Sequence, residues 1–137
     1  MSAFVTGYKT TLSASITSTD TTIPVSSVTT VDSHVLVTAD LDSVVFLVIE
    51  PGGSNQEIIR CTAISSLTFT GATRGLAFYG SSVAAVTANQ KAHNAGSVVI
   101  MSNVHHIYEL LVDLDAAQTL TGIKTFTQTA MPRLNAQ

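Results

Sequence analysis

Apolar and polar residues alternate with a period of two along much of the first hundred residues, and this pattern predicts short β-strands. In residues 10–17 the alternation puts Leu12, Ala14 and Ile16 on one side of a strand, with Thr and Ser on the other. Pro24 is expected at an edge or at the start of its strand, because it cannot donate a ladder hydrogen bond. Further strands are predicted at residues 23–25, 33–38, 67–70 and 97–101.

A hairpin in the middle of the chain is the strongest prediction of this pattern. Residues 44–49 are six consecutive apolar residues between polar ones, which favours a strand buried on both faces. The following Pro51-Gly52-Gly53-Ser54-Asn55 supplies the backbone conformations of a reversal. Residues 57–62 then form the return strand, so this hairpin is expected at the centre of the core. Residues 83–89 are compatible with a short helix or with a loop.

The periodicity changes at Ser102 from two to about three and a half. Apolar residues then recur at spacings of three, four and three, which is the a/d pattern of two heptads. A helix of about 12 residues is unstable alone in water, so another surface must cover it. Two interpretations remain open: the helix packs on its own domain, or several copies associate around an axis. The residues of this predicted seam are Val104, Ile107, Leu111 and Leu114.

The segment 116–137 contains no core of its own. Residues 119–127 are β-prone, and Pro132 interrupts the residues after them. A strand with apolar residues on both faces and no partner is an edge-pairing hazard. We therefore expect Leu120, Ile123 and Phe126 to be buried between subunits.

The composition bounds the possible functions. A chain of 137 residues is one domain, and charged residues make up only 11% of it, with a net charge of -3. The electrostatic signature of a nucleic-acid-binding protein is missing, so no nucleic-acid partner is expected. The 20 Thr and 15 Ser residues suit a pleated sheet. The longest apolar run, residues 44–49, is far shorter than the roughly 20 residues of a membrane span. No signal-peptide pattern is visible, so synthesis in the cytoplasm without membrane insertion is expected.

Candidate catalytic and metal-binding groups are few. Cys61 lies in a β-type pattern and is expected to be a buried small hydrophobic residue instead of a nucleophile. His93 is expected to make a hydrogen bond that stabilises a turn. His105 and His106 are adjacent and point to different faces of a helix, so solvent-facing positions are favoured over a metal site.

Two acidic pairs complete the search for chemistry. Asp40 with Asp42, and Asp113 with Asp115, lack the further oxygen ligands and the glycine of a calcium loop, and they are expected to be solvated. Neither a phosphate-binding loop nor a nucleophile elbow occurs. No catalytic residue, cofactor site or metal site is therefore predicted, and the chain is expected not to be an enzyme.

Several stretches resemble, in order, a β module of tailed-bacteriophage appendage proteins, common in the N-terminal parts of tail fibres. These are residues 11–25, which end in Thr22-Ile-Pro-Val25, then Glu57-Ile-Ile-Arg-Cys-Thr62, Leu67-Thr-Phe-Thr-Gly-Ala-Thr-Arg-Gly75 and Ala92-His-Asn-Ala-Gly-Ser-Val98. Separately, Gln118-Thr-Leu-Thr-Gly-Ile-Lys-Thr-Phe126 is similar to the Gln-Thr-x-Thr-Gly-x-Lys-Thr-Phe segment of phage tail-fibre chains. The family is typically trimeric, which favours a three-fold bundle for residues 102–114.

The residues and the resemblance together predict a mainly β protein. A small β-sandwich or barrel at residues 1–101 docks on the particle, a short trimerisation helix follows at 102–115, and an extended intersubunit β-segment occupies 116–137. The expected function is that of a non-enzymatic virion structural protein, a tail-fibre base or adaptor. Its expected partners are two further copies of itself and other proteins of the tail, baseplate or capsid, and its expected location is the virion, after assembly in the host cytoplasm. The alternatives are a capsid decoration or head-fibre protein, and a carbohydrate-binding or receptor-binding module using Phe78 and Tyr79.

Overall fold

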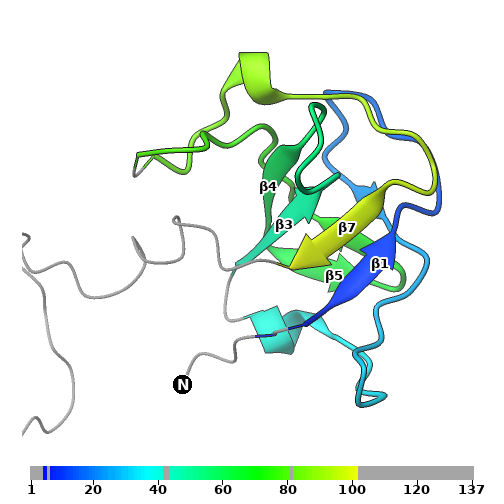
Figure 1. Cartoon of the computed structure of the whole chain (residues 1–137). Helices are drawn as coiled ribbons and strands as arrows, with labels where there is room; N and C mark the ends of the chain where they lie inside the picture. Colours follow the sequence, from blue (N-terminus) through cyan, green and yellow to red (C-terminus); the bar gives the residue numbers. More distant parts are fainter. Residues whose placement is uncertain (1–4, 6, 42–43, 81, 102–137) are drawn as a thin grey trace, which may run out of the picture.

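The fold is mainly β, with two antiparallel sheets around one core (Figure 1). The computed structural model describes residue 5 and residues 7–41, 44–80 and 82–101. One sheet has the strand order β1-β7-β3-β4, and the other has the order β2-β6-β5. The strands are β1 (Lys9–Thr11), β2 (Ile23–Pro24), β3 (Val45–Ile49), β4 (Glu57–Cys61), β5 (Ala63–Ser65), β6 (Thr68–Thr70) and β7 (Val98–Met101), and the 3-10 helices are η1 (Thr38–Leu41) and η2 (Thr87–Asn89).

The predicted central hairpin is confirmed. β3 and β4 pair antiparallel, with Leu47 opposite Ile59, and the intervening turn contains Gly52 at a φ of +79°. Alternate residues of β3 point to opposite sides, and both sides are buried. Leu47 and Ile49 belong to the main core, whereas Phe46 and Val48 belong to a smaller cluster on the outer face of the same sheet.

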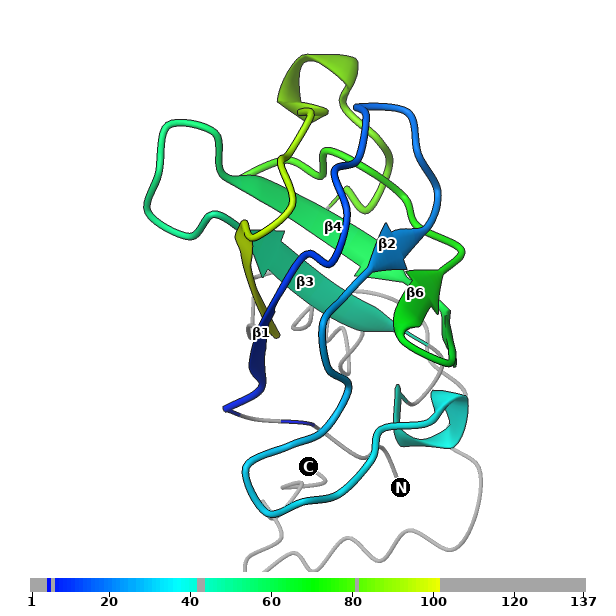
Figure 2. The ribbon, with the colours of Figure 1, turned by 90° about the vertical axis from the view of Figure 1, so that its right-hand side faces the viewer.

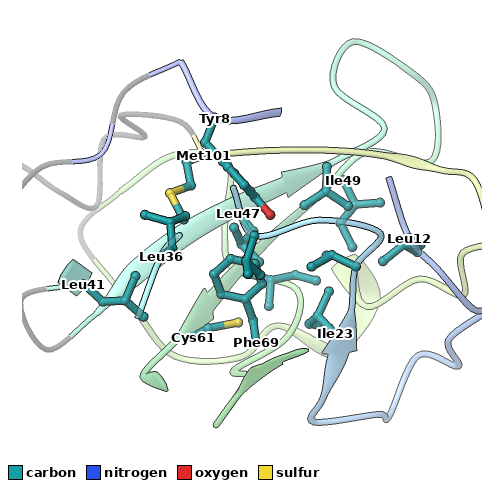
Figure 3. Packing of buried hydrophobic residues seen from close by; sticks show 14 of the residues in the cluster. Tyr8, Leu12, Ile23, Leu36, Leu41, Leu47, Ile49, Cys61, Phe69 and Met101 are labelled. Atoms are coloured by element: carbon teal, nitrogen blue, oxygen red, sulfur yellow. The ribbon is translucent and has the colours of Figure 1, made fainter. Parts of the chain in front are cut away.

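The main core lies between the two sheets. Figure 3 shows Phe69 of β6 among Ile23, Leu47 and Cys61, all of them fully buried. The Phe69 ring also meets the Tyr8 ring edge on, with 6.1 Å between centroids. Each such fully buried apolar side chain contributes roughly 1.5–3 kcal/mol through removal of its surface from water.

Hydrogen bonds connect the two sheets at both corners. At one corner only Thr62 separates β4 from β5, and its N–H donates to Thr70 O at 3.1 Å. At the other corner Leu12 and Val25 form an isolated antiparallel β-bridge, and Ser26 N donates to Thr11 O at 2.9 Å. The sheets therefore close on each other as a small barrel, and this closure protects strand edges that an open sheet would expose.

Two predicted strands are shorter than expected or absent. The strand predicted at residues 10–17 ends at Thr11, and only isolated bridges follow it, from Leu12 to Val25 and from Ile16 to His93. Leu12 and Ile16 are buried as predicted, but Ala14 is exposed. Residues 33–38 form no strand. Their alternation is real, since Leu36 is buried between exposed Val35 and Val37, but the chain turns back at Ser33 and enters η1 at Thr38.

The remaining predictions in this part of the chain hold. β2, β6 and β7 lie within the predicted residues 23–25, 67–70 and 97–101, and β2, which carries Pro24, is an edge strand of its sheet. Residues 83–89 are mostly a loop, which ends in the single turn of η2. No helix in the described ranges is long and apolar enough to cross a membrane. The helix predicted at 102–115 and the segment 116–137 lie outside the described residues.

Candidate functional site: a buried carboxylate, guanidinium and imidazole cluster

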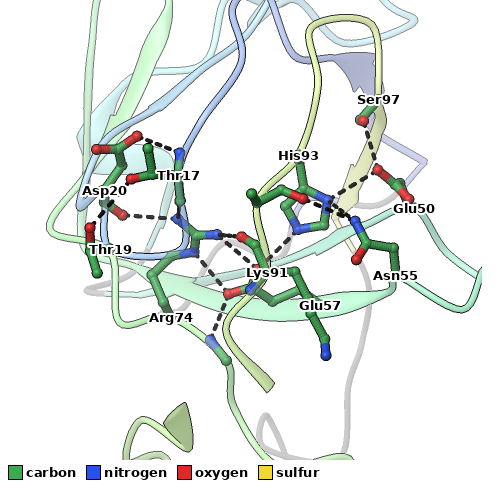
Figure 4. A network of polar contacts seen from close by, with 12 residues as sticks. Thr17, Thr19, Asp20, Glu50, Asn55, Glu57, Arg74, Lys91, His93 and Ser97 are labelled. Carbon is green, nitrogen blue, oxygen red and sulfur yellow. Dashed lines mark hydrogen bonds and ion pairs between the residues drawn. The ribbon is translucent and has the colours of Figure 1, made fainter. Parts of the chain in front are cut away.

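Three ionisable side chains from distant parts of the chain meet in the interior (Figure 4). We call Glu57, Arg74 and His93 the buried cluster. Glu57 is the first residue of β4, Arg74 follows β6, and His93 precedes β7. The exposed fractions of the Glu57, Arg74 and His93 residues are 0%, 3% and 2%. Such burial of charge is favourable only if the groups are paired and hydrogen-bonded.

Backbone pairing brings these residues together. The chain after β6 continues alongside β4, where Thr73 and Arg60 exchange two backbone hydrogen bonds. This pairing places Arg74 beside the start of β4. His93 and Ile16 exchange backbone hydrogen bonds of 3.0 and 2.9 Å, which fix the loop before β7 against the loop after β1.

Arg74 binds Glu57 in a bidentate manner. Its Nε donates to Oε1 and one terminal nitrogen donates to Oε2, both at 2.8 Å. This parallel arrangement is the strong geometry of an arginine and a carboxylate. The remaining guanidinium hydrogens go to backbone carbonyls of Thr17 at 2.8 Å, Asp20 at 3.1 Å and Lys91 at 2.6 Å. Arg74 therefore connects β4 to the loop before β2 and to the loop before β7.

The Glu57 carboxylate accepts three further hydrogen bonds. Gly75 N donates to Oε1 at 2.8 Å, Lys91 N donates to Oε2 at 3.0 Å, and His93 Nε2 lies 2.9 Å from Oε2. Burial alone raises the pKa of Glu57, but the hydrogen bonds from His93 and Arg74 and the charge of Arg74 outweigh it and hold that pKa below the ordinary value. Glu57 is thus a buried carboxylate kept ionised by its partners.

His93 extends the network towards the surface. Its Nδ1 lies 3.1 Å from Glu50 Oε1 and 3.3 Å from Asn55 Nδ2. Glu50 Oε1 also accepts from Ser97 Oγ at 2.8 Å. Hydrogen bonds from His93 and Ser97 lower the pKa of Glu50, whose side chain is partly exposed.

This arrangement suits the stabilisation of the fold better than catalysis. A general base needs a lone pair within hydrogen-bond reach of a substrate, whereas the Glu57 oxygens already accept five hydrogen bonds and the His93 side chain is fully buried. Removing any one partner leaves a buried charge or donor uncompensated. The buried cluster therefore holds four segments of the chain together.

The structure corrects the prediction for His93 and extends two others. His93 does not stabilise a local turn with its ring, because the ring contacts residues 36 to 43 positions away in sequence. Cys61 is buried as predicted, and burial raises the pKa of its thiol to about 12, so it is protonated at neutral pH. Asp40 accepts hydrogen bonds from Val37 N and pairs with His34, and these interactions lower its pKa.

The predicted interface residues lie outside the described part of the chain. These are Val104, Ile107, Leu111, Leu114, Leu120, Ile123 and Phe126, and the same is true of Asp42, His105, His106, Asp113 and Asp115. Within the described ranges no group of three or more His, Cys, Asp or Glu side chains is arranged to hold a metal ion. Phe78 and Tyr79 are exposed on the loop that follows Leu76.

Sequence reasoning missed the cluster as a unit, although a signal existed. Glu57 opens a strand whose next two residues are apolar and buried, and a carboxylate in such a position needs a cationic partner. The partners are 17 and 36 residues away, beyond the range of any local pattern. Comparisons with protein-family models, with curated proteins and with solved structures found no match.

Proposed function

We propose that this chain is a non-enzymatic structural protein of a bacteriophage virion, which docks on the particle through its β domain and assembles as a homotrimer through residues 102–126. The proposal requires no cofactor and no nucleic acid. It applies equally to a tail-fibre base and to a capsid decoration or head-fibre protein, which differ in the virion protein that the domain binds.

One observation carries the proposal. Three of the stretches that resemble the phage appendage module each contribute one residue to the buried cluster: Glu57 from Glu57-Ile-Ile, Arg74 from the turn before Gly75, and His93 from Ala92-His. Polar residues that the resemblance picks out are thus fold determinants in this domain. A module identified by such residues is characterised by its shape and rigidity, which is what a docking component of a particle needs.

The rest of the described domain is consistent with this role. Its sheets close on each other, so it can dock as a rigid body, and its low charge favours apolar and hydroxyl contacts over ionic ones. The predicted seam and β-segment supply apolar surfaces that other copies can bury, as in a closed symmetric assembly.

A pair of matched variants of the full chain tests the trimer. Replacing Ile107 and Leu111 by Asp should dissociate it, because unpaired charges would be buried at the predicted seam. Replacing His105 and His106 by Asp should leave the mass measured by light scattering unchanged, since these are the predicted solvent-facing positions. If the Ile107→Asp/Leu111→Asp variant keeps the mass of the parent chain, the proposed seam is wrong.

A further inference from the structure

β7 is the strand that joins the β domain to the rest of the chain. It ends at Met101, and the sequence continues from there through residues 102–137. In its sheet β7 lies between β1 and β3, with three residue pairs on each side (Figure 1). Any pull on residues 102–137 therefore reaches the domain at the C-terminal end of a strand that is paired on both sides.

The direction of such a pull decides how the hydrogen bonds of β7 are strained. The hydrogen bonds of an antiparallel pair lie perpendicular to the strands. β3 runs antiparallel to β7, with Leu47 opposite Met101. β3 ends at Ile49, so the turn between β3 and β4 (residues 50–56) lies at the other end of the sheet from Met101 (Figure 2). A pull between this turn and Met101 slides the two strands past each other, and it strains all the hydrogen bonds between them at the same time.

A pull between the two ends of the domain strains β7 differently. β1 is antiparallel to β7, with Lys9 opposite Ile100, and Met101 N donates to Tyr8 O at 3.2 Å. The chain therefore enters β1 beside the point where it leaves β7. A force that separates these two points peels β1 from β7 and breaks their hydrogen bonds one after another. Peeling therefore needs a smaller force than sliding does.

The buried cluster holds the loop before β7 and opposes withdrawal of the strand. Lys91 N donates to Glu57 Oε2 at 3.0 Å, and Lys91 O accepts from Arg74 at 2.6 Å. The ring nitrogens of His93 lie 2.9 Å from Glu57 Oε2 and 3.1 Å from Glu50 Oε1. Sliding of β7 towards its C-terminal end would pull this loop after it. Glu57 and Arg74 would then stay buried without these partners, which is costly.

We propose that the β domain anchors residues 102–137 against tension, with β7 as the strand that bears the force and the buried cluster as the stop before it. This inference rests on the proposed function, in which the domain is docked on a particle and the residues after Met101 join other copies. A domain that is held at residues 50–56 resists this tension by sliding contacts and not by peeling contacts. Forced unfolding is governed by the unfolding rate, so such an anchor resists force without a large free energy of unfolding.

Optical tweezers on single molecules test this dependence on direction. The full chain carries Ile107→Asp and Leu111→Asp, so that each tether holds one copy. One handle is attached to the C-terminus, and the other is attached either at Ser54→Cys or at the N-terminus. Ser54 is exposed in the turn after β3, and the one natural cysteine, Cys61, is fully buried and does not compete for the handle. The rupture force should be several-fold higher with the handle at residue 54 than with the handle at the N-terminus.

The variant Arg74→Met separates the stop from general stability. It should lower the rupture force measured from residue 54 and leave the force measured from the N-terminus unchanged, because β1 peels from β7 before the buried cluster is strained. An equal loss of force in both directions would overturn the role of the cluster. If this variant does not fold, the comparison of the two directions with Arg74 in place still decides.

The outcomes also separate this inference from the proposed function. Equal rupture forces in the two directions overturn the anchor and leave the trimer intact. A monomeric mass for the chain without the two Asp substitutions overturns the proposed assembly, and with it the source of the tension.

Discussion

Glu57, Arg74 and His93 illustrate how ionisable residues that are buried together can determine which segments of a chain meet. Replacing a buried ion pair by apolar residues of similar shape is often neutral, so the pair itself is a weak source of net stability. Removing one partner is costly, because the other charge stays buried. The cluster therefore specifies which segments of the chain meet, and each of its members depends on the others.

Loss of the guanidinium should destabilise the domain strongly. Arg74→Met leaves the Glu57 carboxylate buried without its cationic partner, and it leaves three backbone carbonyls without a donor. We expect a loss of about 3–5 kcal/mol in the free energy of unfolding, measured by urea titration at pH 7. The control is Arg60→Met on β4, the strand that carries Glu57, where the partly exposed side chain should contribute about 1 kcal/mol or less. Equal losses of unfolding free energy for the two variants would contradict this role of the buried cluster.

Glu50 should make stability depend on pH in the acid range. Its pKa is lower in the folded protein than its ordinary value of 4.5, so its contribution is present above pH 4.5 and is lost as the pH falls through the folded value. Wild type should therefore exceed Glu50→Gln in unfolding free energy above pH 4.5. This difference should shrink towards zero at lower pH, as followed by urea midpoints. A difference in unfolding free energy that grows on acidification would contradict a lowered pKa of Glu50 in the folded protein.

At the scale of elements, the turn after Arg74 is tightly constrained. Gly75 has a φ of +64°, and a Cβ there would lie 2.7 Å from Gln90 N and 2.8 Å from Val86 O. Its own N–H donates to Glu57. Both the backbone conformation and the space therefore require glycine at this position.

Gly75→Ala should consequently cost more than an alanine at a glycine with the same backbone preference but open space. Gly52 is that control, because its φ is +79° and a Cβ added there would meet nothing within 4 Å. We expect Gly52→Ala to lose about 1–2 kcal/mol from the left-handed conformation alone. Gly75→Ala should lose clearly more, and thermal unfolding of the two variants decides the comparison. Equal melting temperatures would mean that the turn relaxes without disturbing the cluster.

Sequence patterns predicted those elements whose burial is decided locally. The β3–β4 hairpin was predictable because a six-residue apolar run and a Pro-Gly-Gly turn both specify it. The strand expected at residues 10–17 was too long, because alternation at Leu12 and Ile16 continues while the chain changes its pairing partner. Side-chain alternation reports which residues face the core, but hydrogen-bond pairing is decided by distant segments.

The buried cluster lies at the limit of such reasoning for the same reason. Glu57 in an apolar strand indicates a buried carboxylate, but nothing local identifies Arg74 or His93 as its partners. Their pairing depends on the chain continuing from β6 alongside β4 and on the bridge between Ile16 and His93. Each of these contacts joins segments that are distant in the sequence.

At the scale of the whole molecule, the chain divides into a domain that is complete in its core and a C-terminal part for which we propose burial between copies. The main core lies between two sheets joined at both corners, and the buried cluster fixes the loops at one end. Residues 102–126 carry the apolar patterns of the predicted seam and β-segment. Symmetric association of three copies would bury both the seam and the β-segment.

The solution mass of the full chain, compared with that of a version ending at Met101, tests this central claim most directly. Light scattering should give three times the chain mass of 14.3 kDa for the full chain, and the mass of a single copy for the shortened one. Circular dichroism of the shortened version should show that its β structure is retained. A full chain that remains monomeric at high concentration would contradict the trimer, and a shortened version that remains trimeric would contradict the role assigned to residues 102–137.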